Sequence, residues 1–216
     1  MAGVKQFDRD VVLDRAMEVF WRRGYEATSI QELVETTGIN RGSIYGTFGD
    51  KQGLFLAALD HYWEKIAKPM MAELSHPDPH HALERMLESI VRRTSDPRFP
   101  RGCLATNTSL ECPATGEEIS RRIAAGFGQQ ESAIYRVLHR AQLAGRLDSR
   151  VDLRALARFF LAVAQGMNVV NKALPDPEIL KDISRVAMTV WGAASPAPKS
   201  KRGARTRKSA SSQAEN

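Results

Sequence analysis

The chain has little of what secreted and membrane-spanning proteins carry. Its 216 residues include two cysteines, Cys103 and Cys112, too few for a disulfide framework, so reduced thiols are expected. No apolar run approaches the roughly 18 residues of a membrane span, and the opening stretch MAGVKQFDRD lacks an apolar signal segment. These absences predict a cytoplasmic protein with no membrane contact.

Motifs for enzyme chemistry are missing as well. The sequence has no Ser/His/Asp spacing, no glycine-rich phosphate loop and no His/Glu metal helix. His76, His80 and His81 share a proline-rich segment and could bind a stray metal ion, but a solvated turn is the simpler interpretation. The sequence therefore predicts neither catalysis nor a cofactor.

Positive charge is plentiful only at one end. The chain carries +6, of which the segment 195–216, with six Lys/Arg and one Glu, holds +5, so the remainder is near +1 by subtraction. Residues 1–51 contain seven Lys/Arg and eight Asp/Glu. Bulk charge therefore identifies no nucleic-acid-binding domain. The tail's composition predicts disorder or an auxiliary electrostatic arm, and it leaves open a non-specific nucleic-acid binder driven by the tail.

Apolar residues recur at helical spacing along nearly the whole chain, and no sustained period-two alternation predicts a strand pair. Thr28 and Gln31 form a T-x-x-Q pattern typical of a capping box, and Gly38 provides a stop signal. The sequence thus predicts an all-α fold. The expected helices span about 8–23, 29–37, 41–48, 50–74, 82–93, 102–111, 115–144, 153–174 and 178–191.

The segment GINRGSIYGTFGDK, residues 38–51, contains an unusual short helix. Asn40 is a good N-cap, yet Gly42 and Gly46 each cost a helix interior roughly 1 kcal/mol relative to alanine. Two short helices joined by T-G-I-N are typical of a helix-turn-helix, in which a missing side chain lets the main chain approach a phosphate. An ordinary helical hairpin remains the alternative at this point, because such short matches also arise by accident.

Residues from about Val12 to Leu54 resemble the N-terminal domain of the TetR/AcrR family of bacterial transcriptional regulators. The resemblance rests, in order and without gaps, on Ala16, Phe20, Gly24-Tyr25, Thr28, Leu33-Val34, Gly38-Ile39-Asn40, Gly42-Ser43-Ile44-Tyr45, Phe48 and Lys51-x-x-Leu54. It implies a homodimer of about nine helices per chain that binds a near-palindromic operator as a transcriptional regulator, most simply a repressor. The implied parts are a helix-turn-helix DNA-binding domain over 1–51, a linking helix over about 50–74, an effector-binding and dimerisation domain over 75–194, and a disordered basic tail over 195–216.

The resemblance also implies which residues contact double-stranded operator DNA. It places Thr28 and Ser29 at a phosphate near the start of the second helix. Three side chains face the bases: Arg41, Ser43 and Thr47. Tyr45 and Lys51 contact the DNA backbone. Gly42 and Gly46 let the main chain of the helix approach the DNA closely. Arginine suits bidentate recognition of guanine, whereas a tyrosine hydroxyl positions the protein without reading sequence.

By the same analogy, the C-terminal half binds a small-molecule effector of unknown identity and releases DNA by moving the DNA-binding domains apart. The candidate pocket residues are Met86, Ile90, Phe99, Cys103, Leu104, Phe127, Ile134, Phe159 and Met167. For each of them a plain core position is the competing interpretation. The candidate dimer face, on the last two helices, comprises Leu153, Leu156, Phe160, Val163, Ile183, Val190 and Trp191, although a buried helix within one chain would look similar.

Cys103 carries one further hypothesis. It lies in the segment R-G-C-L-x-x-N-x-x-x-E, residues 101–111, which looks like a segment found in one subgroup of the family. A thiol near the start of a short helix can react with electrophiles or oxidants, more readily if Lys172 lies beside it. A small buried side chain is the competing interpretation, which free cysteine most often is.

Overall fold

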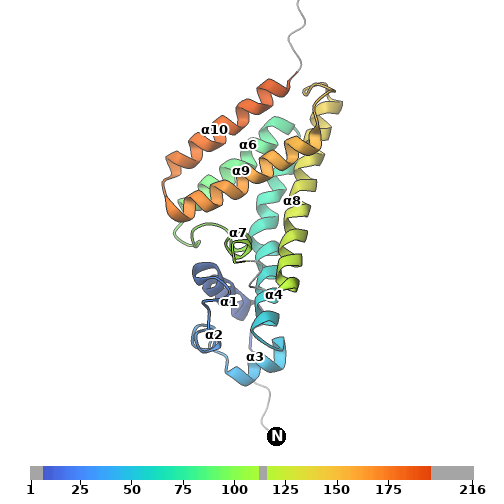
Figure 1. The fold of residues 1–216 in the computed structure, drawn as a ribbon. Coiled ribbons are helices and arrows are strands. Elements are labelled where there is room, and N and C mark those ends of the chain that lie inside the picture. The colour runs from blue at the N-terminus through green and yellow to red at the C-terminus, as the bar shows by residue number, and fades with distance from the viewer. Residues whose placement is uncertain (1–6, 112–115, 196–216) are drawn as a thin grey trace, which may run out of the picture.

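The computed structural model describes residues 7–111 and 116–195, and within these ranges every regular element is helical. The basic tail, apart from Ser195, and Cys112 lie outside the described residues. Figure 1 shows an elongated molecule with a small group of helices at one end and a bundle at the other. The helices are α1 (Arg9–Arg23), α2 (Ile30–Thr37), α3 (Arg41–Phe48), α4 (Lys51–Tyr62), α5 (Lys68–Ala72), α6 (Pro79–Thr94), α7 (Leu104–Ser109), α8 (Glu117–Leu143), α9 (Leu153–Ala173) and α10 (Pro177–Ala194).

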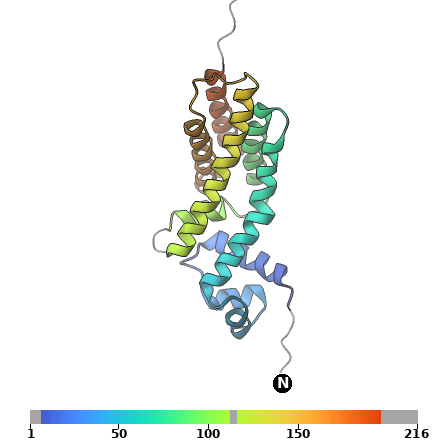
Figure 2. The same ribbon diagram turned by 90° about the vertical axis from the view of Figure 1, so that its right-hand side faces the viewer.

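Helices α1, α2 and α3 form the head of the molecule, and α4 leads from it into the bundle (Figures 1 and 2). The expected linking helix over 50–74 is nearly continuous, but it changes form at its centre. A π-helical segment, Trp63–Ala67, joins α4 to α5, and a 3₁₀ turn, Glu73–Ser75, closes it. Such π-turns are uncommon, and they often coincide with functional sites.

Local sequence signals account for most of the helix ends. Gly38 adopts the left-handed conformation (φ 76°) that the tight turn between α2 and α3 needs. The Asn40 side chain then accepts a hydrogen bond from the Ser43 amide at 2.8 Å and starts α3. The T-x-x-Q capping box is wrong, because Ser29, the next residue along, caps α2 by accepting from the Glu32 amide at 3.1 Å. The displaced Thr28 hydroxyl is buried and donates to the Gly24 carbonyl at 2.6 Å.

Two hydrophobic cores hold the chain together. The first core joins the head to α4 and is completed by Cys103, Leu104 and Ala105 and by two isoleucines of α8. The second core fills the bundle of α6, α8, α9 and α10. Helix α7 thus packs against the head from the bundle side, which connects the two parts of the molecule through apolar contact.

Helix α9 is long and apolar enough to cross a membrane, with a mean hydropathy of 1.2. It did not stand out in the sequence, because polar residues interrupt its apolar run. The fold supplies another reason for this composition. One face of α9 is buried against α6 and α8, and a second apolar face lies beside α10. A helix with two packing faces needs apolar residues on most of its surface.

The start of α6 offers a test of stability against pH. Asp78 caps this helix by accepting from the His80 and His81 amides, and it forms an ion pair with Arg146. The hydrogen bond from Arg146, followed by those backbone bonds, lowers the pKa of the Asp78 carboxyl from 3.8 to about 2. Because this pKa is lower in the folded chain, the stabilisation is present above pH 4 and is lost as the pH falls toward 2.

We therefore expect Asp78→Asn to lower the melting temperature at neutral pH. The difference from wild type should shrink between about pH 4 and pH 2, which thermal unfolding monitored by circular dichroism measures. A difference that stays constant over this interval would mean that the carboxylate charge adds nothing to the cap.

Candidate DNA-binding interface

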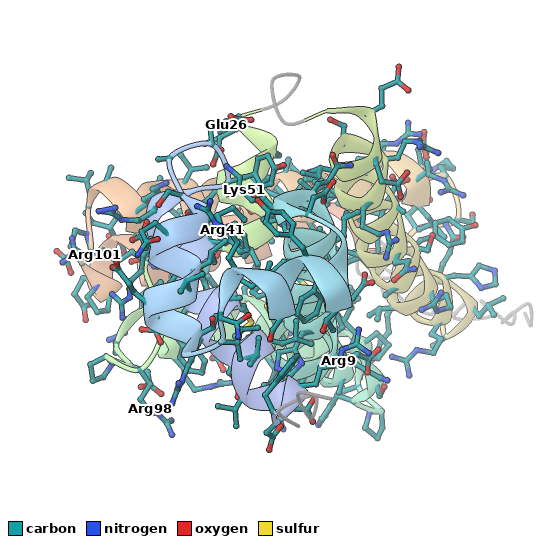
Figure 3. The ribbon with its side chains drawn as sticks, turned by 90° about the horizontal axis from the view of Figure 1, so that it is seen from below. Arg9, Glu26, Arg41, Lys51, Arg98 and Arg101 are labelled. Carbon is teal, nitrogen blue, oxygen red and sulfur yellow. The ribbon has the colours of Figure 1, made fainter. Side chains whose placement is uncertain are left out.

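Helix α3 lies on the outer end of the head, and Figure 3 views this end directly, with Arg41, Lys51 and Arg9 labelled on it. Ile44 is completely buried and anchors the helix to the first core. Its other side faces solvent: Ser43 is half-buried, and the exposed residues are Arg41, Gly42, Tyr45, Gly46 and Thr47. An anchored helix with an exposed polar side can enter a groove without loss of core packing.

Neither glycine of α3 is needed for packing inside the protein. A Cβ atom at Gly46 would have no neighbour within 4 Å, and one at Gly42 would meet only the Asn40 side-chain oxygen, at 3.3 Å. Both residues have ordinary helical backbone, so no left-handed conformation explains them. Bare main chain at these two positions therefore costs helix stability without an internal benefit. The remaining physical reason is close approach of something outside the chain.

The N-termini of α2 and α3 lie in the head with their caps exposed at Ser29 and Asn40. Amide groups and the helix dipole at such ends favour an anion such as a phosphate. Thr28 was predicted to share this role with Ser29. The Thr28 side chain is only 1% exposed and its hydroxyl is bonded to the Gly24 carbonyl, so of the two residues only Ser29 has an exposed side chain.

Lys51 holds the loop before α2 and does not extend freely into solvent. Its ammonium group donates to the Thr28 carbonyl at 2.9 Å and to the Glu26 carbonyl at 3.4 Å, and it lies 4.5 Å from the centre of the Tyr25 ring. An ammonium has three N–H donors, so one remains for a phosphate. Lys51 thus positions the start of α2 in addition to any contact of its own.

A carboxylate from the bundle side holds the same loop. Glu111, just beyond α7, accepts hydrogen bonds from the backbone amides of Tyr25 at 3.2 Å and Glu26 at 2.9 Å. Within α7, the Asn107 side chain donates to the Trp21 carbonyl at 3.3 Å. The sequence did not reveal this role of Glu111, because the partners lie more than eighty residues apart. These bonds connect α7 directly to the head.

Glu111→Gln removes the charge and one of the two acceptor oxygens. We expect faster hydrogen exchange at the Tyr25 and Glu26 amides, and a stability loss of about 1–2 kcal/mol, because hydrogen bonds to a charged acceptor are the stronger kind. Glu117→Gln, at an exposed position with no such contact, is the matched control. Unchanged exchange at both amides would show that Glu111 does not hold the loop in solution.

Both parts of the chain match families of known proteins. Residues 12–58 match the bacterial regulatory proteins of the tetR family, and residues 79–187 match a tetracyclin repressor-like C-terminal domain. The transcriptional repressor ComR of Escherichia coli is 31% identical over 189 residues, which cover 87% of this chain and 90% of ComR. The chain belongs to the TetR family of bacterial regulatory proteins.

Other proteins resemble this chain over a similar share of its length. The uncharacterised transcriptional regulator YezE of Bacillus subtilis is 34% identical over 88% of this chain and 99% of its own. Among solved structures, the TetR-family regulator CifR, complexed with 26bp double-strand operator DNA, superposes with a TM-score of 0.81 at 32% identity, covering 87% of this chain and 98% of CifR. This TetR-family protein is therefore a transcriptional regulator and not an enzyme.

The candidate effector residues are distributed over both cores of this TetR-family regulator. Two of them line surface clefts: Phe99, beside Trp21 and Ile66, and Phe159, between α9 and α10. Phe127 packs against the first core, and the buried ones are Cys103 and Leu104 in the first core and Met86, Ile90, Ile134 and Met167 in the second. The structure therefore does not bring the nine together around one cavity.

The candidate dimer residues divide into two sets. Four of them are already buried within one chain and pack in the second core: Leu153, Leu156, Phe160 and Trp191. The other three, Val163, Ile183 and Val190, line an apolar groove between α9 and α10 together with Phe159 and Val186. The first four leave little surface for a partner, since helical periodicity reveals apolar faces without revealing which face the chain itself covers. Val186, which was not among the candidates, is 57% exposed in this groove.

Cys103 is buried at 5% exposure, and its sulfur lies 3.0 Å from the Tyr62 hydroxyl. Burial raises the pKa of Tyr62 well above 10, so this hydroxyl stays protonated at neutral pH. Lys172 is exposed on the last turn of α9. These surroundings favour the small buried residue over the thiol sensor.

Proposed function

We propose that this protein is a dimeric transcriptional repressor of the bacterial cytoplasm. It binds a near-palindromic operator through α3 of each subunit and leaves the operator when a small molecule occupies the C-terminal half. One observation carries the DNA-binding part. Gly42 and Gly46 lie on the exposed side of an anchored helix, and neither glycine is needed inside the protein.

In this proposal α3 enters the major groove with the bare main chain of Gly42 and Gly46 against the DNA. Arg41 and Thr47 read base edges, with Ser43 beside them, and Tyr45 contacts the phosphate backbone. Ser29 presents the N-terminus of α2 to a phosphate, and Lys51 holds that end in place while offering its third N–H group. Domains over 1–51 and 75–194 follow the family division, with the linking helix between them.

A dimer is required because one eight-residue helix buries too little surface to specify an operator. The groove lined by Phe159, Val163, Ile183, Val186 and Val190 supports a dimer face formed by α9 and α10. Two copies of this helix pair would form a four-helix interface related by two-fold symmetry. The complex of CifR, a relative of similar fold, with double-strand operator DNA supports operator binding by this chain.

Selection of bound sequences from a random pool of duplex DNA tests the proposal. We expect a motif with two-fold symmetry and half-sites about one helical turn apart. The same selection with a chain truncated at Ser195 distinguishes a specific regulator from a tail-driven binder. A regulator keeps its motif after truncation, with a smaller salt dependence. Loss of all binding on truncation, or selection of no motif by either protein, would contradict the proposal.

A further inference from the structure

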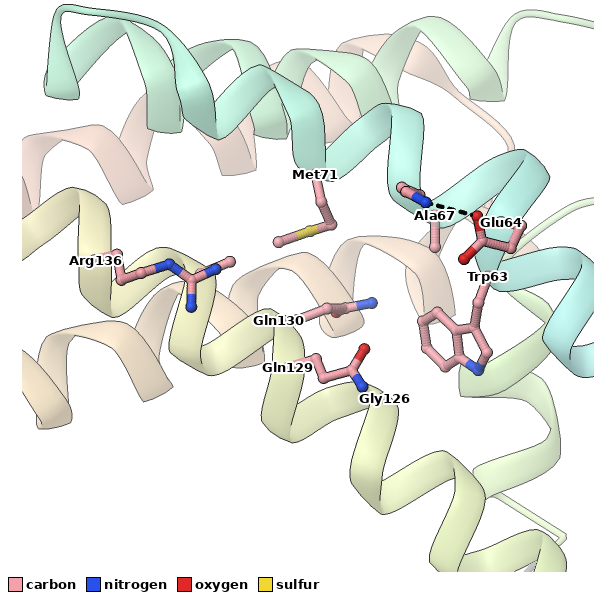
Figure 4. Close-up of a pocket in the computed structure, with 10 residues that line it drawn as sticks. Trp63, Glu64, Ala67, Met71, Gly126, Gln129, Gln130 and Arg136 are labelled. Carbon is pink, nitrogen blue, oxygen red and sulfur yellow. Dashed lines mark hydrogen bonds and ion pairs between the residues drawn. The ribbon is translucent and has the colours of Figure 1, made fainter.

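A cleft of about 280 Å³ lies between the π-helical segment of the linking helix and α8. Figure 4 shows its walls, with Trp63, Ala67 and Met71 facing Gln130 and Arg136 across the opening. This volume is slightly below the roughly 300 Å³ at which the usual range for small-molecule sites begins, so it suits a small ligand. The lining residues are Trp63, Glu64, Ala67, Lys68, Met71, Gly126, Gln129, Gln130, Ala133 and Arg136.

The inner end of the cleft is built by a close contact between two helices. A Cβ atom at Gly126 would collide with the Trp63 ring, so glycine is required for the indole to lie against α8. Trp63 is also the first residue of the π-helical segment. A molecule that displaced this ring would therefore act on the least regular turn of the helix that leads to the head.

The cleft contains a hydrogen-bond donor on a largely buried side chain. Gln130 is 6% exposed, and its carbonyl oxygen accepts from the Gln165 amide at 2.9 Å. Gln165 in turn accepts from the Thr106 hydroxyl at 2.6 Å. This order of donors and acceptors leaves the Gln130 NH₂ group open to the cleft, where the oxygen of a ligand can accept a hydrogen bond from it.

The outer end of the cleft carries unneutralised positive charge. Lys68 is paired with Glu64 at 2.7 Å across one turn, shown by the dashed line in Figure 4. Arg136 lines the cleft, and none of the ion pairs among the described residues involves it. Arg136 lies six positions after Gln130, which corresponds to about 9 Å along α8. Between them lie Ala133 on α8 and Met71 opposite.

We propose that this cleft binds a small apolar carboxylate with a hydroxyl or carbonyl oxygen at its far end. The carboxylate pairs with Arg136, the apolar body lies between Met71 and Ala133, and the far oxygen accepts from Gln130. A guanidinium recognises a carboxylate through two parallel hydrogen bonds. This molecule would be the effector of the regulator, so its effect on DNA rests on the proposed function, whereas its binding does not.

The cleft has two physical connections to the head. One passes from Gln130 through Gln165 to Thr106 on α7, the helix whose end holds the head loop through Glu111. The other is Trp63, on the linking helix itself. A ligand bound in this cleft therefore contacts the linking helix directly and is connected to α7 through the side chains of Gln130 and Gln165. It can shift the position of the head if it binds the two head positions unequally.

Three related probes separate the parts of the proposal: 4-hydroxyphenylacetate, its neutral amide, and phenylacetate, which lacks the far oxygen. Isothermal titration calorimetry of the full chain without DNA should give saturable binding of 4-hydroxyphenylacetate with a Kd of about 1 mM or lower. The other two probes should bind at least about tenfold more weakly, because each leaves one protein group unpaired.

Arg136→Gln should weaken the binding of 4-hydroxyphenylacetate by about tenfold or more and remove the preference for the acid over the amide. Arg136→Lys keeps the charge and should restore part of the binding. Lys172→Gln, which also removes an exposed positive charge but on α9 and outside the cleft, should leave the affinity for 4-hydroxyphenylacetate unchanged. Absence of saturable binding, or equal affinity in wild type and Arg136→Gln, would overturn the proposal.

The selected operator provides a separate readout. A chain that binds its operator but none of the three probes would contradict the ligand class alone, and the proposed function would stand. A chain that binds 4-hydroxyphenylacetate through Arg136 but no DNA would keep the cleft assignment and reject the regulator. In the expected case, 4-hydroxyphenylacetate lowers operator affinity in wild type and has no effect on Arg136→Gln.

Discussion

Gly42→Val is expected to weaken operator binding at least tenfold, about 1.4 kcal/mol, with little change in folding. The added side chain would project from the exposed side of α3, where the main chain approaches the DNA in our proposal. Within the protein its Cβ meets only the Asn40 side-chain oxygen at 3.3 Å, which a small shift relieves. Fluorescence anisotropy with the selected operator measures the affinity, and thermal unfolding measures the stability.

Gly128→Val is the matched control for Gly42→Val. Gly128 is an exposed residue within α8, and a Cβ there has open space, so the same substitution is tolerated far from α3. Operator affinity should then remain at the wild-type value. If Gly42→Val lost folding and binding to the same extent, the glycine would serve local packing and the principal argument for DNA contact would fail.

Val186→Asp is expected to convert the dimer to a monomer and to abolish operator binding at subunit concentrations where wild type is saturated. The residue is 57% exposed in one chain, so the monomer should fold normally. In a dimer formed through the α9–α10 groove, symmetry would bury two unpaired carboxylates. We expect the dimer dissociation constant to rise at least about a hundredfold, about 2.7 kcal/mol, which analytical ultracentrifugation measures.

Leu143→Asp tests whether the position, and not the charge alone, causes this effect. Leu143 is 76% exposed at the end of α8, outside the groove, and its substitution should leave the dimer intact. By contrast, Phe160→Asp should prevent folding, because that side chain is fully buried in the second core. A Val186→Asp protein that remains dimeric would exclude the groove as the subunit interface.

Much of the head follows from sequence because its signals are local. Gly38, Asn40 and the spacing of Ile44 specify a turn, a cap and an anchor within a few residues, and the structure contains all three. Thr28 shows the limit of such reasoning. Threonine and serine are both good caps, and only the packing of the loop assigns the cap to Ser29 and buries Thr28.

Helix α9 shows a second limit. Its apolar residues cover two faces, and the dimer prediction combined three residues of the face that the chain itself buries, Leu153, Leu156 and Phe160, with Val163 of the groove. Phe159 was assigned to an effector pocket, yet it lies in the groove with Val163 and Val190. The period of a helix gives the direction of each side chain from the axis, but it does not identify the neighbouring helix.

The sequence by itself determined the all-helical fold, the helix-turn-helix with its bare glycines and the family of this regulator, because these depend on residues within a turn or two of one another. Only the tertiary structure decided which face of α9 is exposed and that Glu111 accepts hydrogen bonds from the head loop. It also decided that Arg136 and Gln130 face the linking helix across a cleft. These features join residues tens of positions apart. Their contacts arise from the packing of whole helices, which local propensity does not encode.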